Sequence, residues 1–293
     1  MTLFASQIVD GLADGAIYAS LALALVFSYR STGIVNFAQG EMAMLSAYLV
    51  WQLMAWGLPL VPAALISIAI SFVAGALLYA TIVKPLSHAS LLTVVSVLIG
   101  LYLALNSLAG FLWSYTIKAL PSLFPKAHVQ FGSFAVSVET LGIIGVVGLV
   151  LLLLYLLFET TKVGLAMRGA ASTPDSAVLV GVSVPVMLLI GWGIAAALGA
   201  LSGILVAPKV FLNPTMMFGV IIYAFAAATL GGFDSVVGAV VGGLLVGVVE
   251  NLVGTYIPWI GPDLKIIVAL ILIFGTLLIK PDGLFGRKKV VRL

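Results

Sequence analysis

Long uninterrupted runs of apolar residues constrain this chain more than any other feature, and residues 142–158 form the clearest of them. Of the 293 residues, 63% are hydrophobic and 8% are charged, against about 45–50% and 25% in a soluble domain. A soluble core stops growing at about 250–300 residues, so it could not hide this much apolar surface. Lipid must therefore be the solvent for much of the chain.

In lipid, the backbone can satisfy its polar groups only as helices or as a closed barrel. Barrel strands alternate apolar and polar residues, whereas the runs here are continuous. We predict an all-α, polytopic transmembrane helix bundle with eight or nine spanning helices, forming a single membrane domain over residues 1–293. The candidate spans lie near 8–28, 36–56, 60–82, 91–112, 139–158, 186–207, 216–231, 236–257 and 264–280. Segment 216–231 is short and ends in two glycines, so eight spans plus a re-entrant or broken helix is the alternative.

The distribution of basic residues predicts the orientation, because cytoplasmic loops carry an excess of Lys and Arg. With the N-terminus outside, the inner side holds Arg30, Lys84, Lys162, Arg168, Lys280, Arg287, Lys288, Lys289 and Arg292. The outer side holds only Lys118, Lys126, Lys209 and Lys265. We therefore predict an outer N-terminus and a cytoplasmic C-terminus. The first ten residues lack the basic region of a cleavable signal peptide, so the first hydrophobic segment is expected to remain as a span.

Pairs of glycines four residues apart predict close helix packing, since small residues let helices approach each other in lipid. Three such pairs are present: Gly199 with Gly203, Gly238 with Gly242, and Gly243 with Gly247. Packing is the favoured interpretation for all six, ahead of a direct role in ligand binding.

The longest inner loop, about 159–184, contains the signals of one short helix. Thr173 can cap it, Pro174 suits its first position, and Asp175 complements the positive end of the helix dipole. Gly181 can end it in a left-handed conformation. Such a helix is too short to span a membrane. It either docks into a groove of another protein or lies as a turn on lipid headgroups.

Polar residues at the start of the second candidate span could lie on a solute path. Asn36 and Gln39 have the spacing of a capping box. Glu41 falls about one turn deeper, near the membrane edge, where a charge is costly unless it faces a partner, the bundle interior or water. A structural alternative pairs Glu41 with a helix N-terminus or with a nearby arginine such as Arg30.

Other polar residues are scattered through the spans, and each could equally be a hydrogen-bond partner between helices. Asp10 and Asp14 lie one helical turn apart in the first span, and Glu250 precedes Asn251 in the eighth. We add Glu250 and Asn106 to the path candidates. Asn106 is preferred, because it can contact a zwitterion without itself being charged.

Several chemistries have no sequence support. There is no cysteine, and two histidines forty residues apart are a poor start for a metal site. Phosphate-binding loops, hydrolase elbows and zinc-protease motifs are all absent, so an enzyme is not expected. We expect this chain to bind no metal, cofactor or nucleic acid.

Five segments in order resemble the LivH-type permease of branched-chain amino acid ABC importers, a bacterial inner-membrane family. They are DGLADGAIYA (10–19), VNFAQGE (35–41), AMRGAASTPDSAVLVG (166–181), LGGFDSVVGAVVGG (230–243) and KPDGLFG (280–286). Each motif is weak alone, but together they cover essentially the whole chain. Gln39 stands where the family usually has His, Gly169 where Ala is common, and Ser176 where a second Ala is common.

This resemblance implies a permease subunit that moves branched-chain amino acids, or related small amino acids, amides or urea, into the cytoplasm by alternating access. It implies four kinds of partner outside this chain: a LivM-type permease, two cytoplasmic ATP-binding subunits that hold ATP and Mg²⁺, an extracytoplasmic solute-binding protein, and the bilayer. It also implies that the inner loop is an ATPase-coupling loop, marked by Arg168, Thr173, Pro174, Asp175 and Gly181.

The main alternative is an ion-coupled secondary transporter or channel for a small polar solute, in which Glu41 or Glu250 titrates. Such a protein works alone and needs no cytoplasmic docking helix. A second alternative is a non-transporting subunit of a membrane complex.

Overall fold

The computed structural model describes residues 2–125, 127–131, 134–261 and 264–286. The described chain divides into two compact units, each assembled from separate stretches of sequence. The first unit comprises Met1–Val26, Ser122–Gly145 and Phe218–Leu293, and the second comprises Phe27–Pro121 and Val146–Met217. Helices α1 (Thr2–Thr32), α5 (Val138–Thr160) and α9 (Met217–Gly231) contribute residues to both.

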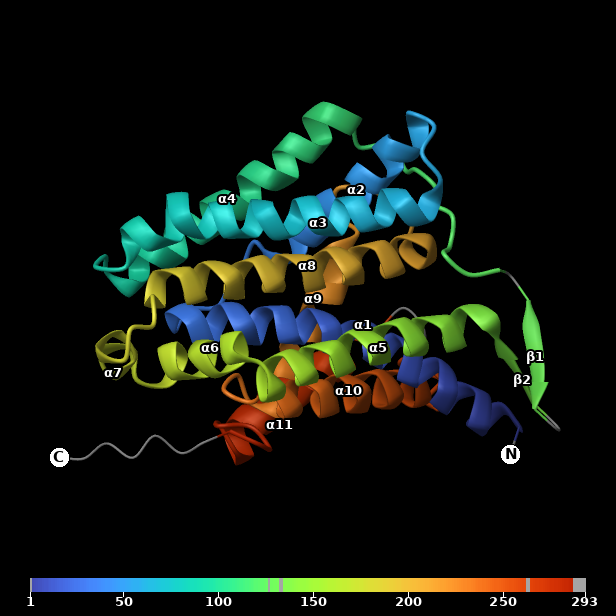
Figure 1. Cartoon of the computed structure of the whole chain (residues 1–293). Coiled ribbons are helices and arrows are strands. Elements are labelled where there is room, and N and C mark those ends of the chain that lie inside the picture. Colours follow the sequence, from blue (N-terminus) through green and yellow to red (C-terminus); the bar gives the residue numbers. More distant parts are fainter. Residues whose placement is uncertain (1, 126, 132–133, 262–263, 287–293) are drawn as a thin grey trace. The chain divides into compact units, whose positions relative to one another are not determined.

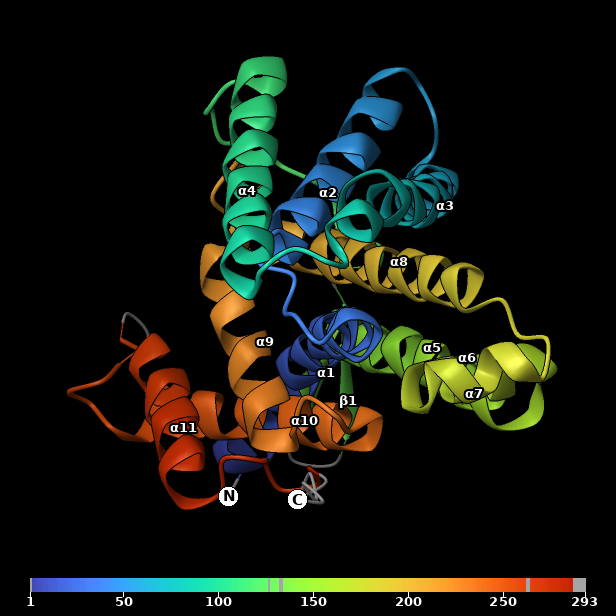
Figure 2. The same cartoon turned by 90° about the vertical axis from the view of Figure 1, so that its left-hand side faces the viewer.

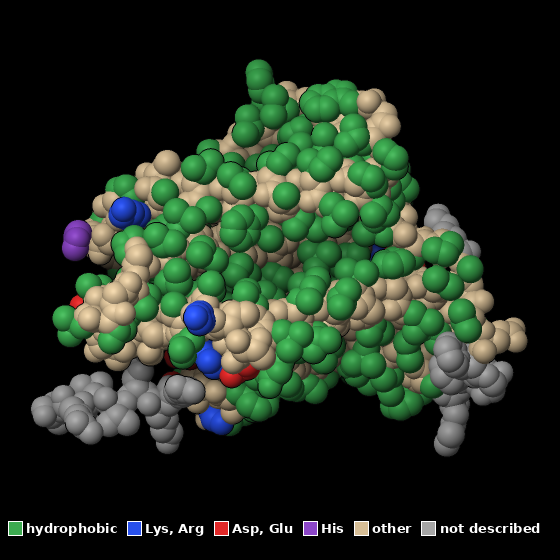
Figure 3. All heavy atoms as spheres, in the orientation of Figure 1, with side chains coloured by type: hydrophobic (Ala, Val, Ile, Leu, Met, Phe, Trp, Pro, Cys, Tyr) green, Lys and Arg blue, Asp and Glu red, His purple; other side chains and the backbone are tan. Residues whose placement is uncertain are grey.

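Helices dominate the structure, as the apolar runs predict (Figure 1). The others are α2 (Gln39–Ala55), α3 (Leu60–Leu78), α4 (Leu91–Trp113), α6 (Lys162–Ser172), α7 (Pro174–Leu179), α8 (Val184–Val210), α10 (Val236–Tyr256) and α11 (Ile266–Ile279). A π-helical turn (Tyr79–Val83) and a 3-10 turn (Lys84–Leu86) extend α3. Hydrophobic side chains cover most of the surface seen in Figure 3, as expected for helices in lipid.

A helix occupies each of the nine predicted ranges, and within the described residues six are long and apolar enough to cross a membrane. The chain is therefore a polytopic helical membrane protein. Segment 216–231, the short candidate span, forms α9. Its 15 residues rise about 22 Å along the helix axis, less than the roughly 30 Å thickness of a hydrocarbon core.

One part of the all-α prediction is wrong. The stretch between α4 and α5 contains two antiparallel strands, β1 (His128–Phe131) and β2 (Phe134–Ser137). Their register pairs His128 with Ser137 and Val129 with Val136. The short alternating patterns on both sides suit a two-stranded ribbon, whose backbone groups pair with each other rather than along a helix.

In the second unit, α8 packs along α3, and α2 packs against both of them (Figures 1 and 2). Gly199 and Gly203, for which the sequence predicts close helix packing, both face α2. A Cβ at Gly203 would overlap the backbone carbonyl of Ala43 on α2, and one at Gly199 would overlap the Gln39 amide. These two glycines set the distance between α2 and α8.

In the first unit, α10 uses its glycines on two faces. A Cβ at Gly238 or Gly242 would overlap the backbone of α9, whereas one at Gly243 or Gly247 would overlap the backbone of α1. The α1 side of this contact is also glycine, because Gly11 and Gly15 face the backbone of α10. The sequence analysis had not assigned packing roles to these last two, although their four-residue spacing carries the same signal.

Candidate functional site

A non-helical segment, residues 33–38, interrupts the second unit and places polar groups deep in the bundle. Gln39, the first residue of α2, donates from Nε2 to the backbone carbonyl of Ala195 at 3.0 Å. Ala195 lies about 17 Å along α8 from its start and about 22 Å from its end at 1.5 Å per residue. Helix α2 therefore begins opposite the middle of α8, and the expectation that Glu41 lies near the membrane edge is wrong.

The polar groups of this break are paired with one another. Asn36 Oδ1 accepts from the Ala38 backbone N–H at 3.1 Å, and Asn36 Nδ2 donates to Gln39 Oε1, also at 3.1 Å. Asn36 and Gln39 are fully buried. The predicted capping box does not form, because Ala38 is the N-cap and no side chain caps the helix. Backbone that is irregular at this depth needs such partners, since lipid offers none.

The break also brings together two path candidates that are far apart in sequence. Asn106 of α4 donates from Nδ2 to Glu41 Oε2 at 3.2 Å and to the backbone carbonyl of Pro214 at 2.8 Å. Glu41 is 3% exposed and lies in the first turn of α2. Glu41 Oε2 and the Pro214 carbonyl oxygen thus form a small acidic site around the Asn106 amide nitrogen. An ammonium group in the place of that nitrogen could donate to the same two oxygens. We call Asn36, Gln39, Glu41 and Asn106 the polar break.

Glu250, the fifth path candidate, belongs to the first unit. Tyr18 of α1 donates from its hydroxyl to Glu250 Oε2 at 2.8 Å, and Lys265 Nζ lies 3.8 Å from Oε1. The Tyr18 ring stacks on Tyr223 of α9 with centroids 4.9 Å apart. Glu250 is thus paired with groups from α1 and from the start of α11.

Two further polar residues of the first unit, Asn251 and Asp14, join this network, and Asp10 has a separate partner. Lys265 also donates to Asn251 Oδ1 at 3.1 Å, and Asn251 Nδ2 donates to Asp14 Oδ2 at 2.9 Å. Thr140 donates to Asp10 Oδ1 at 3.0 Å. Sequence reasoning placed Lys265 in an outer loop and did not foresee it as the cation of this network. Its signal was a single lysine immediately before an apolar helix, α11, that packs against α10.

The inner loop forms two helices where one was predicted. Helix α7 has Thr173 at its N-cap, Pro174 at its first position and Asp175 in its first turn, and Gly181 follows with φ +83°. These features match the prediction, except that the Thr173 side chain makes no capping hydrogen bond. Arg168 lies on α6, which the sequence analysis missed.

Helix α6 carries its own start signal, since Thr161 accepts from the Gly164 backbone N–H at 3.0 Å. Arg168 pairs with Glu159 at 2.7 Å, at the surface of the second unit. Beyond it, the end of α7 and the residue that follows it present three exposed apolar side chains: Val178, Leu179 and Val180 are 59%, 87% and 79% exposed. A six-residue helix with this tip is shaped for contact with another surface.

Within the described ranges, no group of three or more His, Cys, Asp or Glu side chains is placed so that it could hold a metal ion. The described residues contain a buried polar break, glycine-packed helices and a short helix with an exposed apolar tip. These features belong to a helical membrane protein with polar groups inside its bundle.

The comparisons assign the family. Residues 7–277 match the family of the branched-chain amino acid transport system permease component, and the chain belongs to that family. It is 30% identical over 99% of its length to the high-affinity branched-chain amino acid transport system permease protein LivH of Salmonella typhimurium, covering 98% of that protein. BraD of Pseudomonas aeruginosa is 29% identical with the same coverage, and a probable LivH of Methanocaldococcus jannaschii is 30% identical over 93% of this chain and 90% of that protein.

A solved structure supports the fold independently. One chain of PsaBC from Streptococcus pneumoniae in complex with Fab superposes with a TM-score of 0.50, covering 93% of this chain and 91% of that one. The identity is 13%, so the likeness concerns the fold alone.

Proposed function

We propose that this chain is the permease subunit of an ATP-binding cassette importer. Its substrates would be branched-chain amino acids or closely related small amino acids, amides or urea, carried into the cytoplasm by alternating access. Family membership over residues 7–277 supports the transport role. The observation that carries the ATP-driven mechanism is the exposed apolar tip of α7, which an autonomous transporter would not need.

The proposed assembly contains a LivM-type permease, two ATP-binding subunits that hold ATP and Mg²⁺, and an extracytoplasmic solute-binding protein. The chain would lie in a bacterial inner membrane with its N-terminus outside and its C-terminus inside. In this orientation α6 and α7 face the cytoplasm, where the ATP-binding subunits are. Closure of those subunits would act on α7 only through its differential affinity for two permease states.

The polar break is the proposed contact for the substrate. Glu41 and the Pro214 carbonyl offer acceptors for the ammonium group of an amino acid, with the Asn106 amide now occupying that position. The apolar residues around the break suit an aliphatic side chain. Few polar contacts are needed if a separate receptor selects the substrate before it reaches the permease.

An ion-coupled secondary transporter is the alternative, and one observation favours it. The Glu41 carboxylate is buried and hydrogen-bonded to a neutral amide, an arrangement that ion-coupled carriers use to exchange a proton or cation. A carrier of this kind would transport without ATP and without a partner.

The test begins with the tagged full chain, solubilised gently from its host. Co-purification of a second permease and two ATP-binding subunits, and ATP-dependent uptake of labelled leucine after reconstitution with the receptor, would support the importer. A chain that purifies alone, with uptake driven by an ion gradient, would support the alternative.

A variant of α7 sharpens this test. We expect Leu179→Ser to abolish co-purification of the ATP-binding subunits while expression and melting temperature stay unchanged, because Leu179 makes few contacts within the chain. Leu92→Ser is the matched control, since Leu92 is 77% exposed but belongs to α4 rather than to the inner loop. Equal behaviour of the two variants would contradict a docking role for α7.

A further inference from the structure

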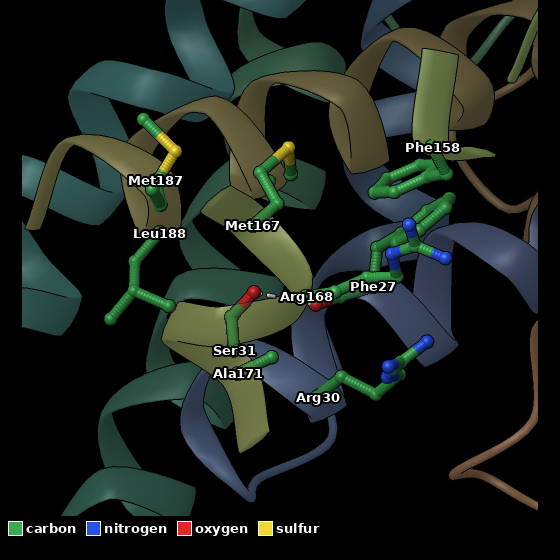
Figure 4. A pocket seen from close by; sticks show the side chains of 10 residues that line it. Phe27, Arg30, Ser31, Phe158, Met167, Arg168, Ala171, Met187 and Leu188 are labelled. Atoms are coloured by element: carbon green, nitrogen blue, oxygen red, sulfur yellow. Dashed lines mark hydrogen bonds between the residues drawn. The ribbon is translucent and has the colours of Figure 1, made fainter. Parts of the chain in front are cut away.

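A pocket in the second unit lies where α1, α5, α6 and α8 meet. It is lined by Phe27, Arg30, Ser31, Phe158, Met167, Arg168, Ala171, Met187, Leu188 and Gly191. Figure 4 shows Arg30, Arg168 and the two phenylalanines on one side, with Met187 and Leu188 on the other. The lining is therefore mixed: the two arginines lie beside the aromatic pair, and aliphatic side chains lie opposite. Neither the polar break nor the α7 tip takes part in it.

The pocket lies at the level of the helix ends. Phe27, Arg30 and Ser31 fall in the last turns of α1, Phe158 in the last turn of α5, and Leu188 in the second turn of α8. Each is within about 8 Å of a helix terminus at 1.5 Å per residue. For helices that cross a bilayer, this depth is the boundary between hydrocarbon and headgroups.

The size of the pocket excludes an enclosed solute. Its cavity volume is about 30 Å³, which is room for about two water molecules. An amino acid or a nucleotide would not fit inside. A ligand must instead lie across the mouth, with a charged group at one end and an apolar part extending away.

The two arginines offer several donors for such a charged group. Each guanidinium has five N–H groups in a planar fork that matches a phosphate, so an arginine that already bonds one protein group retains others. Arg168 donates to Glu159, but the two side chains are 39% and 47% exposed, so solvent weakens their attraction. Arg30 and Arg168 both line the pocket, so two cationic side chains lie at its mouth.

The apolar residues of the lining suit a hydrocarbon chain. Phe158 stacks on Phe27 with centroids 5.1 Å apart, and Met167 and Met187 add flexible thioethers. Methionine adapts to irregular apolar partners. Beyond the pocket, Tyr155 and Leu156 on α5 are exposed, as residues facing acyl chains would be.

We propose that this pocket binds an anionic phospholipid, with its phosphate on Arg30 and Arg168 and its acyl chain along Phe158, Met187 and Leu188. Basic pockets between spanning helices at the headgroup level recognise such lipids. A bound lipid touches α1, α6 and α8 together, so it stabilises the attachment of α6 on α8. Because α7 follows α6 directly, lipid composition would control how firmly the docking helix is held.

The test measures the melting temperature of the purified full chain in detergent, titrated with phosphatidylglycerol, phosphatidylcholine or inorganic phosphate. We expect phosphatidylglycerol alone to raise it. Arg30→Gln and Arg168→Gln should each weaken the apparent affinity about five-fold, the contribution of one basic residue at an anionic surface. Lys162→Gln, an exposed cation on the same helix as Arg168, is the control and should leave the affinity unchanged.

If an arginine variant folds poorly, a variant that binds phosphatidylglycerol more tightly still tests the proposal. Glu159→Gln removes the carboxylate that competes for Arg168, so it should tighten phosphatidylglycerol binding. A purely structural Arg168–Glu159 pair predicts no such gain. Equal stabilisation by phosphatidylcholine, equal stabilisation by inorganic phosphate, or undiminished binding in the double arginine variant would each overturn the proposal.

Discussion

Glu41 is the most informative single residue, because its carboxylate is buried and accepts a hydrogen bond from the neutral Asn106 amide. A charge in such a place is costly and is retained where it has a partner or a function. If Glu41 served only to anchor Asn106, a neutral acceptor of the same shape would do as well. The charge itself therefore needs an explanation, and an ammonium group of the substrate supplies one.

We expect Glu41→Gln to lower leucine uptake about ten-fold, because a hydrogen bond between charged partners contributes about 1–2 kcal/mol more than a neutral one. Folding should be preserved, since glutamine can still accept from Asn106. Uptake by the reconstituted transporter and its melting temperature are the two measurements. Glu139→Gln, whose carboxylate bonds Ser122 at a loop, is the control. Unchanged uptake in Glu41→Gln would assign Glu41 a structural role.

In the first unit the most informative residue is Lys265, the cation beside the buried Glu250 carboxylate. We expect Lys265→Met to destabilise the chain by about 1–3 kcal/mol, because it leaves the buried Glu250 carboxylate without its cation. Adding Glu250→Gln should recover most of the loss, since the unpaired charge is then removed. Thermal unfolding of the single and double variants in detergent measures both effects. A double variant that is less stable than Lys265→Met would contradict this pairing.

At the scale of elements, the contact between α2 and α8 depends on the absence of side chains. Gly203 faces the backbone carbonyl of Ala43, which cannot move without shifting α2. The same contact fixes Gln39 against the middle of α8, so the geometry of the polar break depends on this packing. Helix packing and the candidate site are therefore one structural feature.

We expect Gly203→Ala to cost about 1–3 kcal/mol of stability, the usual effect of overpacking a tight contact, and to lower uptake. Gly100→Ala on α4 is the matched control, because an added Cβ there meets nothing within 4 Å. The melting temperature and the uptake of both variants, measured side by side, show whether the contact between α2 and α8 requires glycine at position 203. Equal stability would show that α2 and α8 can separate freely.

At the scale of the whole molecule, the number of spans fixes the sides on which the two ends lie. Nine crossings put them on opposite sides, and eight put them on the same side. The chain has no cysteine, so single introduced cysteines can be labelled without background. We expect an impermeant maleimide applied to intact cells to label Leu3→Cys but not Asp282→Cys, both of which are exposed positions. After lysis both should react.

Labelling of both positions from outside, or of neither, would establish an even number of spans. Helix α9, the segment that the sequence singles out, or the equally short α11 would then not cross fully, since both are shorter than a hydrocarbon core is thick. Labelling of Asp282→Cys alone would reverse the proposed orientation.

Much of the molecule follows from local sequence. Continuous apolar runs predict eight or nine spanning helices, because lipid allows only helices or a closed barrel and barrel strands would alternate. Glycine spacing predicts the packing of α8 and α10. The start and end of α7 can be read from Thr173, Pro174 and Gly181, because caps depend on immediate neighbours. These features can be predicted without knowing which helices contact each other.

Tertiary structure alone decided the rest. Asn36 and Gln39 read as a capping box, yet their side chains bond each other and α8, because α2 begins at mid-depth where another helix competes for them. Asn106 and Glu41 lie 65 residues apart, and no local pattern encodes that contact. Lys265 likewise finds Glu250 only when α11 packs on α10. The sequence determined which segments enter the membrane; the packing of those segments decided which polar groups meet, since a polar group in lipid must pair with whatever partner the fold brings to it.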